Sequence, residues 1–568
     1  MCGIFCSLSH HGHIEPDDQT TALLRNRGPD HLEVYQTVIV PDGSVASVQS
    51  QVHATFLSTV LALRGSSVVK QPLVDPATAS LLCWNGEAWS INGEPVVGND
   101  SQIVLSRLLE ASARDGKHAE RAVIDLLCSI RGPYALVFLD ARNNRVFYGR
   151  DCLGRRSLLR KDTNDGSLVL SSVRDNASGN SWSEVEADGI YILNFTEMHH
   201  TKSMPSPKLV RHRRLEQEPG HEISYLLPFP AMDQTLPTIS RPCLDDIIQA
   251  LHASLQDSLR LRVQHVREAV QQLDPPLLQV TKVAVLFSGG LDCTILARMC
   301  HDLLPLQEPI DLLNVAFENP RVHGKLGPSE NPYELCPDRI TGRSSYSELI
   351  QVCPGRAWRF VQVNVPYSES QAHRGSIMTL MHPHNTEMDL SISSALYFAS
   401  RGKGSTNISP EEKTLYTTSA HVLLSGLGAD ELFGGYQRHA TAFARHSYRG
   451  LLNELELDFD RLGKRNLGRD DRVISNSGKE VRFPFLDEDF IALTLRLPVT
   501  VKCDFGSPQV EGSPDPALRL EPAKRALRLL AWDLGMKQVA AEKKRAIQFG
   551  ARTAKMETGR TKGTHVLT

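Results

Sequence analysis

The stretch VAVLFSGGLDCT, residues 283–294, joins a run of apolar residues to a Gly-Gly turn and then to a helix-forming sequence. A short apolar run bounded by a turn is typical of a buried strand. Gly289 and Gly290 lack a Cβ, so the backbone can approach an anion closely, and the free N–H groups of the following helix face the same point. The stretch therefore predicts a phosphate-binding loop, although it lacks the GxxxxGK(S/T) pattern of a Walker loop. The alternative is an ordinary Gly-Gly turn between a strand and a helix.

The sequence on both sides of this loop predicts a parallel sheet. Short apolar runs at residues 283–287, 312–317, 360–365 and 422–424 are separated by stretches with helical periodicity, the first of them at 291–304. Strands that alternate with helices are typical of a doubly wound α/β fold. We assign residues 238–558 to this domain, with irregular inserts at 319–345 and 402–413, a strongly helical part after residue 516 and a polar tail at 559–568.

A second glycine-rich turn, SGLGAD at residues 425–430, follows the last of these strands. Asp292 and Asp430 then both come just after the carboxyl ends of parallel strands, where ligands of such sheets usually bind. Magnesium prefers a few carboxylates together with phosphate oxygens. Ser-Gly-Gly-Leu-Asp at 288–292 resembles the pyrophosphate loop of enzymes that cleave ATP into AMP and pyrophosphate. With that resemblance, we expect Asp292 and Asp430 to share one Mg2+ bound to the phosphates of ATP. Two helix-capping aspartates are the alternative.

Residues 2–200 have a different hydrophobic pattern, in which short runs typical of β-strands predominate. These runs lie at residues 34–40, 81–88, 134–140, 145–150 and 190–194, and helical periodicity appears at 101–113 and 120–130. The mixture predicts a layered α+β domain. Residues 201–237, in which proline and basic residues recur, predict a linker. We interpret its basic cluster at 211–214 as a solvated face, with an RNA or lipid contact as the alternative.

The composition argues against several classes of protein. The 568 residues include 62 Lys+Arg and 65 Asp+Glu, so the formal net charge is −3. Proteins held to nucleic acid or to an anionic membrane by bulk charge normally have a basic surplus, so neither partner is expected. There is no basic region at the N-terminus and no apolar window of about 18 residues, so neither a signal peptide nor a membrane span is predicted. No CxxC pair occurs among the 11 cysteines, which fits a reducing compartment. We expect a cytoplasmic protein.

Cys2 directly follows the initiator methionine, and a small second residue permits removal of that methionine. The chain would then begin with a cysteine whose own α-amine, with an ordinary pKa of about 8, can accept the thiol proton. Nucleophile and base would lie in one residue. Because many proteins begin with Met-Cys and a buried cysteine is usually inert, the position alone is a weak signal.

Further motifs in this part of the chain occur in the order found in class II glutamine amidotransferases. They are RNRGPD at 25–30, LRG at 63–65, WNGE at 84–87, GND at 98–100 and YGRDCLGRR at 148–156. The resemblance implies an N-terminal nucleophile fold with αββα layers. It assigns the Asn85 side chain and the Gly86 N–H to an oxyanion hole. It assigns Arg64 to the α-carboxylate of glutamine, and Glu87 and Asp100 to its α-ammonium. Read alone, Asn85-Gly86 is a hairpin turn and Arg64 a surface charge.

The combination of a Cys2 amidotransferase with a Ser-Gly-Gly-Leu-Asp loop resembles the glutamine-hydrolysing asparagine synthetases over residues 2–555. The late motifs VRFPFLD at 481–487 and KRAIQFG at 544–550 also match. The family implies that Cys2 hydrolyses glutamine to glutamate and ammonia, which crosses an internal tunnel. The second domain uses Mg-ATP to adenylate the side-chain carboxylate of aspartate. Ammonia then attacks the acyl-adenylate, so that asparagine, AMP and pyrophosphate are the products.

The same resemblance implies a set of residues that bind ATP and pyrophosphate: Ser288, Gly289, Gly290, Leu291, Asp292, Cys293, Ser425, Gly426 and Lys544. Lys544 would place a fixed positive charge beside the departing pyrophosphate. A solvated lysine in the sequence Lys543-Lys544-Arg545 is the alternative.

The chain departs from the family's pattern in the second domain. Leu427 stands where asparagine synthetases have a glutamate beside the reacting acyl group, and leucine can neither accept a proton nor pair with a cation. Ser391 stands where they have an arginine near phosphate, and Cys293-Thr294 replaces a pair of serines in the first loop. We therefore expect a protein that hydrolyses glutamine and binds ATP, but makes asparagine poorly or uses another acceptor.

Two other functions stay open. A catalytically weakened scaffold, or a sensor of glutamine or nucleotide, would keep the fold without forming AMP and pyrophosphate. A pyrophosphate-loop enzyme acting on tRNA has its only support in the basic residues at 202–214, and salt-sensitive RNA binding would be its signature. The oligomeric state is not predicted.

Overall fold

The computed structural model describes residues 2–40, 51–175, 181–196, 204–214, 216–217, 223–237, 243–264, 266–267, 280–327, 329–407, 412–556 and 562–567. The chain divides into two compact units, and neither is a continuous stretch of sequence. The first unit comprises Met1–Pro228, Thr379–His384 and Leu462–Gly478. The second comprises Phe229–Met378, Asn385–Arg461 and Lys479–Thr568. Short segments from the later part of the chain therefore fold with its beginning.

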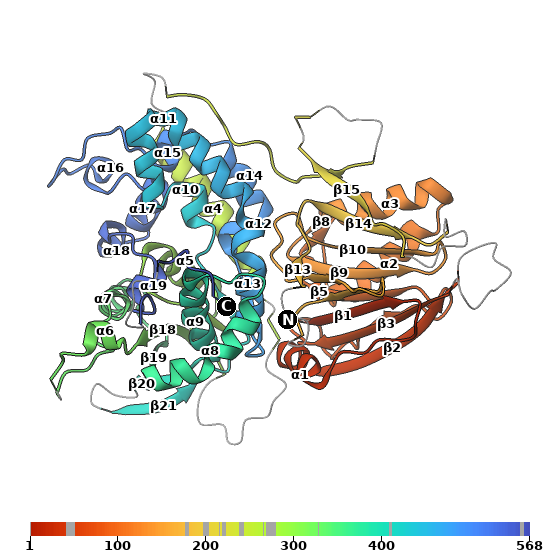
Figure 1. The fold of residues 1–568 in the computed structure, drawn as a ribbon. Coiled ribbons are helices and arrows are strands. Elements are labelled where there is room, and N and C mark those ends of the chain that lie inside the picture. The colour runs from red at the N-terminus through yellow and green to blue at the C-terminus, as the bar shows by residue number, and fades with distance from the viewer. Residues whose placement is uncertain are drawn as a thin grey trace. The chain divides into compact units, whose positions relative to one another are not determined.

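Two β-sheets form the centre of the first unit (Figure 1). One has the order β13-β11-β12-β1-β3-β2, with bounds β1 (Gly3–Ser9), β2 (His31–Ile39), β3 (Val52–Val60), β11 (Leu159–Asp162), β12 (Leu168–Ser171) and β13 (Ser183–Glu184). The other has the order β16-β15-β14-β10-β9-β5-β4, with bounds β4 (Leu73–Val74), β5 (Leu81–Gly86), β9 (Tyr134–Asp140), β10 (Arg145–Arg150), β14 (Gly189–Asn194), β15 (Lys208–Arg213) and β16 (Tyr225–Leu226). A small third sheet contains β6 (Ser90–Ile91), β7 (Glu94–Pro95) and β8 (Ile130–Arg131).

The apolar core of the first unit lies on both faces of these sheets. Between the sheets, Ile4 and Phe56 of one pack with Cys83 and Val137 of the other. Helix α1 (Asp18–Arg27) contributes Leu24 to a cluster on the opposite face of the first sheet. Helices α2 (Asp100–Ser112) and α3 (Gly116–Ser129) pack on the opposite face of the second. Helices thus cover the outer faces of both sheets, and alternate residues of each strand enter different parts of the core.

The segment 201–237, predicted as a linker, contains strands that extend the second sheet. Strand β15 pairs antiparallel with β14, and β16 pairs parallel with β15. The basic side chains of Lys-Leu-Val-Arg-His-Arg obscure its alternation in the sequence, but Val210 at its centre is buried. Residues 201–203, 215 and 218–222 lie outside the described residues.

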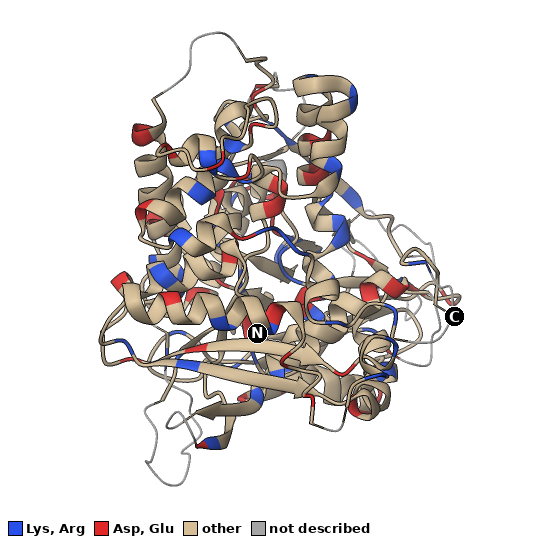
Figure 2. Ribbon diagram, turned by 90° about the vertical axis from the view of Figure 1, so that its left-hand side faces the viewer, with Lys and Arg blue, Asp and Glu red and all other residues tan. Residues whose placement is uncertain are grey.

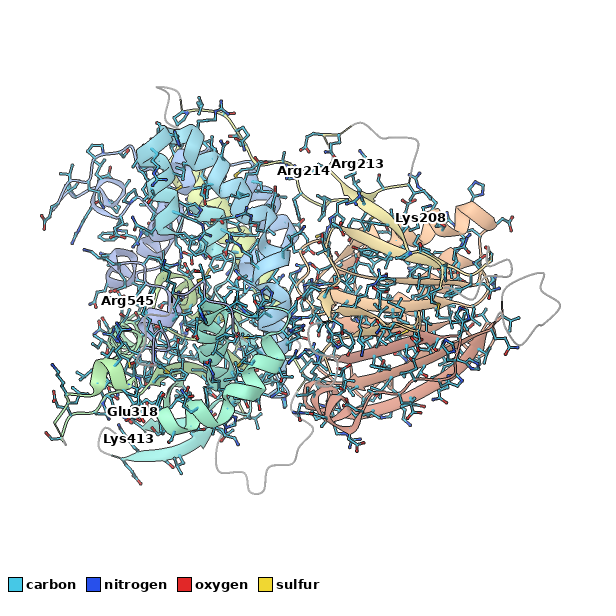
Figure 3. The ribbon with its side chains drawn as sticks, viewed as in Figure 1. Lys208, Arg213, Arg214, Glu318, Lys413 and Arg545 are labelled. Carbon is cyan, nitrogen blue, oxygen red and sulfur yellow. The ribbon has the colours of Figure 1, made fainter. Side chains whose placement is uncertain are left out.

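Carboxylates of the first unit neutralise part of the basic cluster on and after β15. Lys208 Nζ lies 2.7 Å from Glu120 Oε1, and Arg211 lies 3.2 Å from Asp188. Figure 3 labels Lys208, together with Arg213 and Arg214 at the far end of the strand. Ion pairs of this kind favour the interpretation of a solvated protein face.

The second unit is built on a seven-stranded sheet in the order β21-β20-β19-β18-β17-β22-β23. Its parallel strands are β17 (Val283–Leu286), β18 (Ile310–Phe317), β19 (Trp358–Val365), β22 (Val422–Leu424) and β23 (Glu480–Arg482), and the hairpin of β20 (Lys403–Asn407) and β21 (Lys413–Thr417) adds antiparallel strands at one edge. The predicted parallel sheet is confirmed. From β17 the chain builds outward through β18 to β19 and then crosses to β22 on the other side. This reversal creates a topological switch point at the carboxyl ends of β17 and β22.

Helices connect these strands and form the C-terminal part of the unit. They are α4 (Leu244–Val263), α5 (Leu291–Leu303), α6 (Pro320–His323), α7 (Pro337–Val352), α8 (Tyr367–Met381), α9 (Glu387–Arg401), α10 (Ala429–Phe433), α11 (Gln437–Asp460), α14 (Glu488–Leu495), α15 (Val499–Lys502), α16 (Pro516–Arg519), α17 (Arg525–Asp533), α18 (Lys537–Ala541) and α19 (Ile547–Gly550). Within Leu462–Gly478, which belongs to the first unit, lie α12 (Leu462–Arg465) and α13 (Leu467–Ser475).

The two inserts predicted as irregular contain regular structure. Helix α7 begins inside the first insert, where Pro337 occupies its first turn, a position that tolerates proline because the missing N–H has no helical partner. The second insert holds β20, and β21 begins at its last residue, Lys413. Residues 557–561 and 568 of the C-terminal region, including part of the predicted polar tail, lie outside the described residues.

Charge is distributed over the helices and strands without segregation. Figure 2 shows Lys and Arg interspersed with Asp and Glu, in keeping with the formal net charge of −3. Within the described ranges, no helix combines the length and the apolar character needed to span a bilayer.

Candidate functional site

Cys2 lies just before β1, beside the core between the two sheets of the first unit. It is buried, with 8% of its surface exposed. Gln71 Nε2 lies 3.8 Å from Cys2 Sγ, within reach of a weak hydrogen bond to sulfur. Gln71 Oε1 accepts a bond of 2.8 Å from the Trp84 N–H. Gln71 therefore connects the Cys2 sulfur to β5, the strand that carries Asn85.

Asn85 is a buried polar residue at the end of an apolar stripe. Leu81 and Cys83 face the core between the sheets, whereas Leu82 and Trp84 face the helices. The period of two places Asn85 on the same side as Cys83. Its side chain is fully buried, and neither its amide nitrogen nor its amide oxygen has a hydrogen-bond partner among the described residues. Leaving a buried polar group unpaired costs about 1–3 kcal/mol, so this position suits a polar ligand.

Gly86 follows Asn85 in a place that admits no side chain. A Cβ on Gly86 would lie 2.3 Å from Pro133 O and 2.7 Å from Tyr134 Cα. Glycine therefore allows β5 and β9 to stay close together here. The backbone N–H that the resemblance assigns to an oxyanion hole belongs to a residue that packing fixes as glycine.

Arg64, Glu87 and Asp100 gather around Ala88. Arg64 donates hydrogen bonds of 2.8 Å to Ala88 O and 2.6 Å to Val96 O, and lies 3.6 Å from Glu87 Oε2. Asp100 Oδ2 accepts a bond of 2.9 Å from the Ala88 N–H. Burial raises the pKa of Asp100, and the Arg64 guanidinium opposes that rise. The structure thus brings together the three residues predicted to bind glutamine, and it also engages Arg64 and Asp100 with the backbone.

The Ser-Gly-Gly loop of the second unit joins β17 to α5. Gly289 has a φ of +80°, and a Cβ there would lie 2.4 Å from the backbone of Gly342 on α7. Both observations require glycine at this position. Gly290 is the N-cap residue of α5, and Asp292 lies in the first turn. Cys293 Sγ donates to Gly290 O at 3.3 Å, and burial raises the pKa of this thiol.

Four charged side chains meet where the loops after β17 and β22 come together. Lys524 Nζ lies 2.6 Å from Asp292 Oδ2 and 2.7 Å from Asp430 Oδ1. Lys544 Nζ lies 2.6 Å from Asp430 Oδ2, and 4.7 Å from the centre of the Tyr436 ring. The structure therefore places Asp292, Asp430 and Lys544 in one cluster, as their predicted roles around the nucleotide require.

Burial and the two lysines act differently on the two aspartates. Burial raises the pKa of Asp292, and Lys524 offsets only part of that rise. Burial acts in the same sense on Asp430, but Lys524 and Lys544 outweigh it and hold the pKa of that carboxyl well below its usual value. The two carboxylates raise the pKa of Lys524 against the effect of burial, so this lysine stays protonated.

Lys524 and Gln71 are functional candidates that the sequence reasoning missed. Lys524 stands immediately before α17, with a left-handed φ of 56°, in a segment without a recognised motif. Non-glycine residues in this conformation concentrate at functional sites. Gln71 lies between β3 and β4 in irregular chain. Only the structure identifies these two residues, because each acts on a group far away in the sequence.

The residues that depart from the asparagine synthetase pattern lie in two places of the second unit. Leu427 is in the turn after β22, where its N–H bonds Ser425 Oγ at 3.3 Å. Ser391 is on α9, and its hydroxyl donates to Glu387 O at 2.8 Å. A small pocket beside Ser391 is lined by Ser370, Gln371, Arg374, Glu387, Leu390, Ser391, Ser394, Thr553, Lys555 and Met556.

This polar pocket lies at the same edge of the sheet as the nucleotide loop. Its residues Thr553, Lys555 and Met556 belong to a segment that crosses the carboxyl end of β18, since the Phe317 N–H donates to Ala551 O at 3.1 Å. Asn319, which follows β18, donates to Arg552 O at 2.9 Å. Strand β18 is the immediate neighbour of β17, at a spacing of about 4.8 Å.

Comparisons with known proteins agree with these observations. The family model named asparagine synthase matches residues 413–454 and 448–561. Asparagine synthetase domain-containing protein 1 of Gallus gallus is 33% identical over 660 residues, covering 100% of this chain and 99% of its own. The glutamine-hydrolyzing asparagine synthetase of Cricetulus griseus is 24% identical, covering 88% of this chain and 77% of its own. The solved allosteric regulatory enzyme of purine biosynthesis covers 50% of this chain and 60% of its own at 14% identity, but its TM-score of 0.25 is too low to carry an argument. Near-complete coverage at the identity of the first relative shows that the chain belongs to the family of asparagine synthetase domain-containing proteins.

Proposed function

We propose that the protein is a cytoplasmic, glutamine-dependent amidotransferase that consumes ATP. The observation that carries this proposal is the cluster of Asp292, Asp430, Lys524 and Lys544 at the switch point of the second unit. It occurs in a chain whose first unit connects Cys2 to the strand of a buried, unpartnered Asn85 amide. One centre suits release of ammonia and the other suits activation of a carboxylate.

In the first unit, an N-terminal nucleophile fold would present Cys2 to glutamine. After removal of Met1, the α-amine takes the thiol proton and the thiolate attacks the side-chain amide carbon. The Asn85 amide N–H and the Gly86 N–H stabilise the oxyanion that forms. The C–N bond then breaks, ammonia leaves with the proton from the α-ammonium, and water hydrolyses the thioester to glutamate. Arg64, Glu87 and Asp100 hold the amino-acid end of the substrate.

Replacing Asn85 with alanine is expected to lower kcat for glutamine hydrolysis by about 10²–10³-fold, because one oxyanion donor is lost. The folded protein should not be destabilised by loss of a hydrogen bond, since the side chain has no hydrogen-bond partner among the described residues. Ammonia release measured with a coupled dehydrogenase assay checks the first expectation, and a urea unfolding curve checks the second. An Asn85→Ala protein with wild-type kcat would contradict the proposed oxyanion hole.

In the second unit, the Ser-Gly-Gly loop and the start of α5 would receive the phosphates of ATP. The residues present fit magnesium: Asp292 and Asp430 supply carboxylate oxygens, and Asp292 Oδ1 is buried without a hydrogen-bond partner among the described residues. Asp292 and Asp430 would hold the ion, which when bound neutralises charge on the phosphates. Lys524 and Lys544 supply fixed positive charge where pyrophosphate departs.

The pocket beside Ser391 is our candidate for the acceptor. Arg374 and Lys555 suit an acceptor carboxylate, and Glu387 suits an ammonium group of the same molecule. These charges favour an amino acid such as aspartate. Its carboxylate would attack the α-phosphorus of ATP, pyrophosphate would leave, and ammonia would replace AMP at the acyl carbon.

Leu427 and Ser391 remove a carboxylate and a guanidinium from this centre, so we expect weak amide formation or a different acceptor. Product analysis with glutamine, Mg-ATP and a panel of amino acids tests this. The Leu427→Glu variant should form more amide by about 10²-fold, the lower end of the range for one proton-transfer group. Efficient asparagine formation by the wild type, with no gain in the variant, would contradict the altered site. Absence of AMP and pyrophosphate with every acceptor would favour the sensor or scaffold instead.

A further inference from the structure

Both sides of the peptide bond between Cys2 and Gly3 are held by side chains. The Gly3 N–H donates to Thr59 Oγ1 at 2.9 Å, and Thr59 Oγ1 donates in turn to Leu24 O at 2.7 Å. On the other side, Arg27 Nε donates to the Cys2 carbonyl oxygen at 3.2 Å. The plane of this peptide determines how the Cys2 Cα, with its thiol and amine, faces the site. Its carbonyl therefore matters to the nucleophile more than a remote backbone group would.

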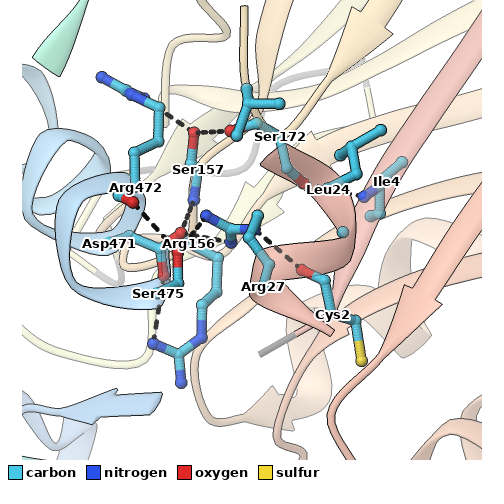
Figure 4. A network of polar contacts seen from close by, with 12 residues as sticks. Cys2, Ile4, Leu24, Arg27, Arg156, Ser157, Ser172, Asp471, Arg472 and Ser475 are labelled. Atoms are coloured by element: carbon cyan, nitrogen blue, oxygen red, sulfur yellow. Dashed lines mark hydrogen bonds and ion pairs between the residues drawn. The ribbon is translucent and has the colours of Figure 1, made fainter. Parts of the chain in front are cut away.

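The remaining donors of Arg27 bind helix α13. The NH2 group lies 2.7 Å from Asp471 Oδ2, and the NH1 group donates to Ser475 Oγ at 2.5 Å. The side chains of Arg27 and Asp471 are fully buried. Figure 4 shows Arg27 between the Cys2 carbonyl and this helix. In low dielectric surroundings, a guanidinium keeps a fixed position only while its charge is matched, so Asp471 determines where Arg27 lies.

Other contacts hold the helix itself without involving the nucleophile. Arg472, the next residue on α13, lies 2.9 Å from Glu184 and donates to Ser157 Oγ at 2.7 Å and to Leu380 O at 3.0 Å. Glu184 therefore holds α13 through Arg472. Asp471 holds Arg27, which bonds the Cys2 carbonyl, and it also accepts from the Ser157 N–H at 3.1 Å and lies 3.6 Å from Arg156. The two roles belong to neighbouring residues of one helix and can be separated by mutation.

The sequence position of α13 adds to this arrangement. The helix lies between α11 and β23, which both belong to the second unit. Strand β23 follows within a few residues, and its Arg482 O accepts the Ser425 N–H of the second glycine-rich turn at 3.0 Å. The residue that fixes Arg27 is thus supplied by the part of the chain that otherwise builds the proposed ATP site.

We propose that Asp471 is a positioning residue for the Cys2 nucleophile, acting through Arg27 on the peptide bond between Cys2 and Gly3. The proposal rests on the proposed attack of Cys2 on glutamine. Loss of Asp471 would leave Arg27 buried without its carboxylate, and Arg27 would move away from the Cys2 carbonyl. The thiol and α-amine would then sample orientations that do not lead to attack. Substrate binding at Arg64, Glu87 and Asp100 would be unchanged.

The test compares Asp471→Asn with Glu184→Gln in the full chain, because each removes one carboxylate that pairs with an arginine around α13. We expect Asp471→Asn to lower kcat for glutamine hydrolysis by about 10–100-fold, the range for a misplaced reacting group, with KM within about twofold. Glu184→Gln should leave kcat within about twofold of the wild type. The second readout is the pH profile of Cys2 alkylation by iodoacetamide, followed by mass spectrometry of the N-terminal peptide. Its midpoint should move upward in Asp471→Asn only, since a loosened thiol loses its fixed relation to the amine.

Equal loss of kcat in both variants, or an unchanged alkylation profile in Asp471→Asn, would overturn the positioning role. If Asp471→Asn does not fold, Ser475→Ala decides, because it removes the other contact of Arg27 with α13 and leaves the charges in place. Ser475→Ala should lower kcat and raise the alkylation midpoint by less than Asp471→Asn would. An unchanged kcat together with an unchanged alkylation profile would overturn the proposal. A wild type whose Cys2 is alkylated but which releases no ammonia contradicts the glutamine proposal. The shifted profile would still support positioning of Cys2.

Discussion

The Cys2→Ala variant is expected to lose ammonia release from glutamine by at least about 10³-fold, because the covalent thioester can no longer form. Nucleotide chemistry should survive in the same variant when ammonium salts replace glutamine, since the cluster around Asp292 lies in the other unit. Glutamate and ammonia are measured by enzymatic assay, and AMP and pyrophosphate by chromatography. Loss of both activities would mean that the variant is misfolded or that the halves do not work as proposed.

Cys6→Ala is the matched control for this variant. Cys6 is also a buried cysteine of the first unit, but it lies in the core between the sheets, where burial raises the pKa of its thiol well above the usual value. A neutral thiol in an apolar core is unreactive. Cys6→Ala should keep ammonia release near the wild-type rate at a modest cost in stability. If ammonia release persists in Cys2→Ala and falls in Cys6→Ala, Cys2 is not the nucleophile.

Replacing Lys524 with methionine is expected to reduce formation of AMP and pyrophosphate by at least about 10²-fold, since a fixed charge at the phosphates is lost. It should also lower the free energy of unfolding by about 3–5 kcal/mol, because Asp292 and Asp430 stay buried with one cation fewer. Burial already raises the pKa of Asp292, and loss of Lys524 raises it further, so at this carboxyl the folded variant binds more protons than the unfolded chain. Stability should therefore fall with rising pH, and the loss relative to the wild type should be larger at about pH 8 than at about pH 5.

Lys282→Met is the control for Lys524→Met. Lys282 directly precedes β17 and pairs with Glu308 at 3.3 Å, with both side chains about a quarter exposed. Exposed pairs contribute about 0–1 kcal/mol, so this variant should resemble the wild type in stability and nucleotide turnover. Urea unfolding at both pH values and AMP formation provide the comparison. Nucleotide turnover in Lys524→Met at the wild-type rate would exclude a role for Lys524 at the phosphates.

Local sequence patterns predicted several strands in both units, because a short apolar run bounded by turn residues is visible in the sequence itself. Tyr134–Asp140 and Arg145–Arg150 in the first unit, and Val422–Leu424 in the second, have the predicted bounds. The strands of 201–237 were missed because β15 gains its order from pairing with β14. Its basic side chains are typical of a solvated segment, and the β-propensity of single residues does not reveal that a segment pairs with a distant strand.

The residues of the candidate site also fall into two groups: those that occur in short local motifs and those that tertiary packing brings in. Cys2, Asn85, Asp292 and Asp430 occur in short motifs, so their types and spacing predicted chemistry before their positions were known. Lys524 lies 232 positions from the Asp292 that it contacts. Asp471 lies 444 positions from Arg27. Such partners are chosen by tertiary packing, and no window of local sequence contains both members of a pair.

The first unit includes Leu462–Gly478, and this has a consequence for the order in which the chain folds. During synthesis, the ribosome adds about 250 residues between Pro228 and Gly478, which takes roughly 12–50 s at about 5–20 residues per second. Throughout that interval the emerging N-terminal part contains Arg27 without Asp471 and Glu184 without Arg472. Chaperones that bind incomplete domains therefore have time to act, and a fragment that ends at Pro228 should be poorly soluble when expressed alone.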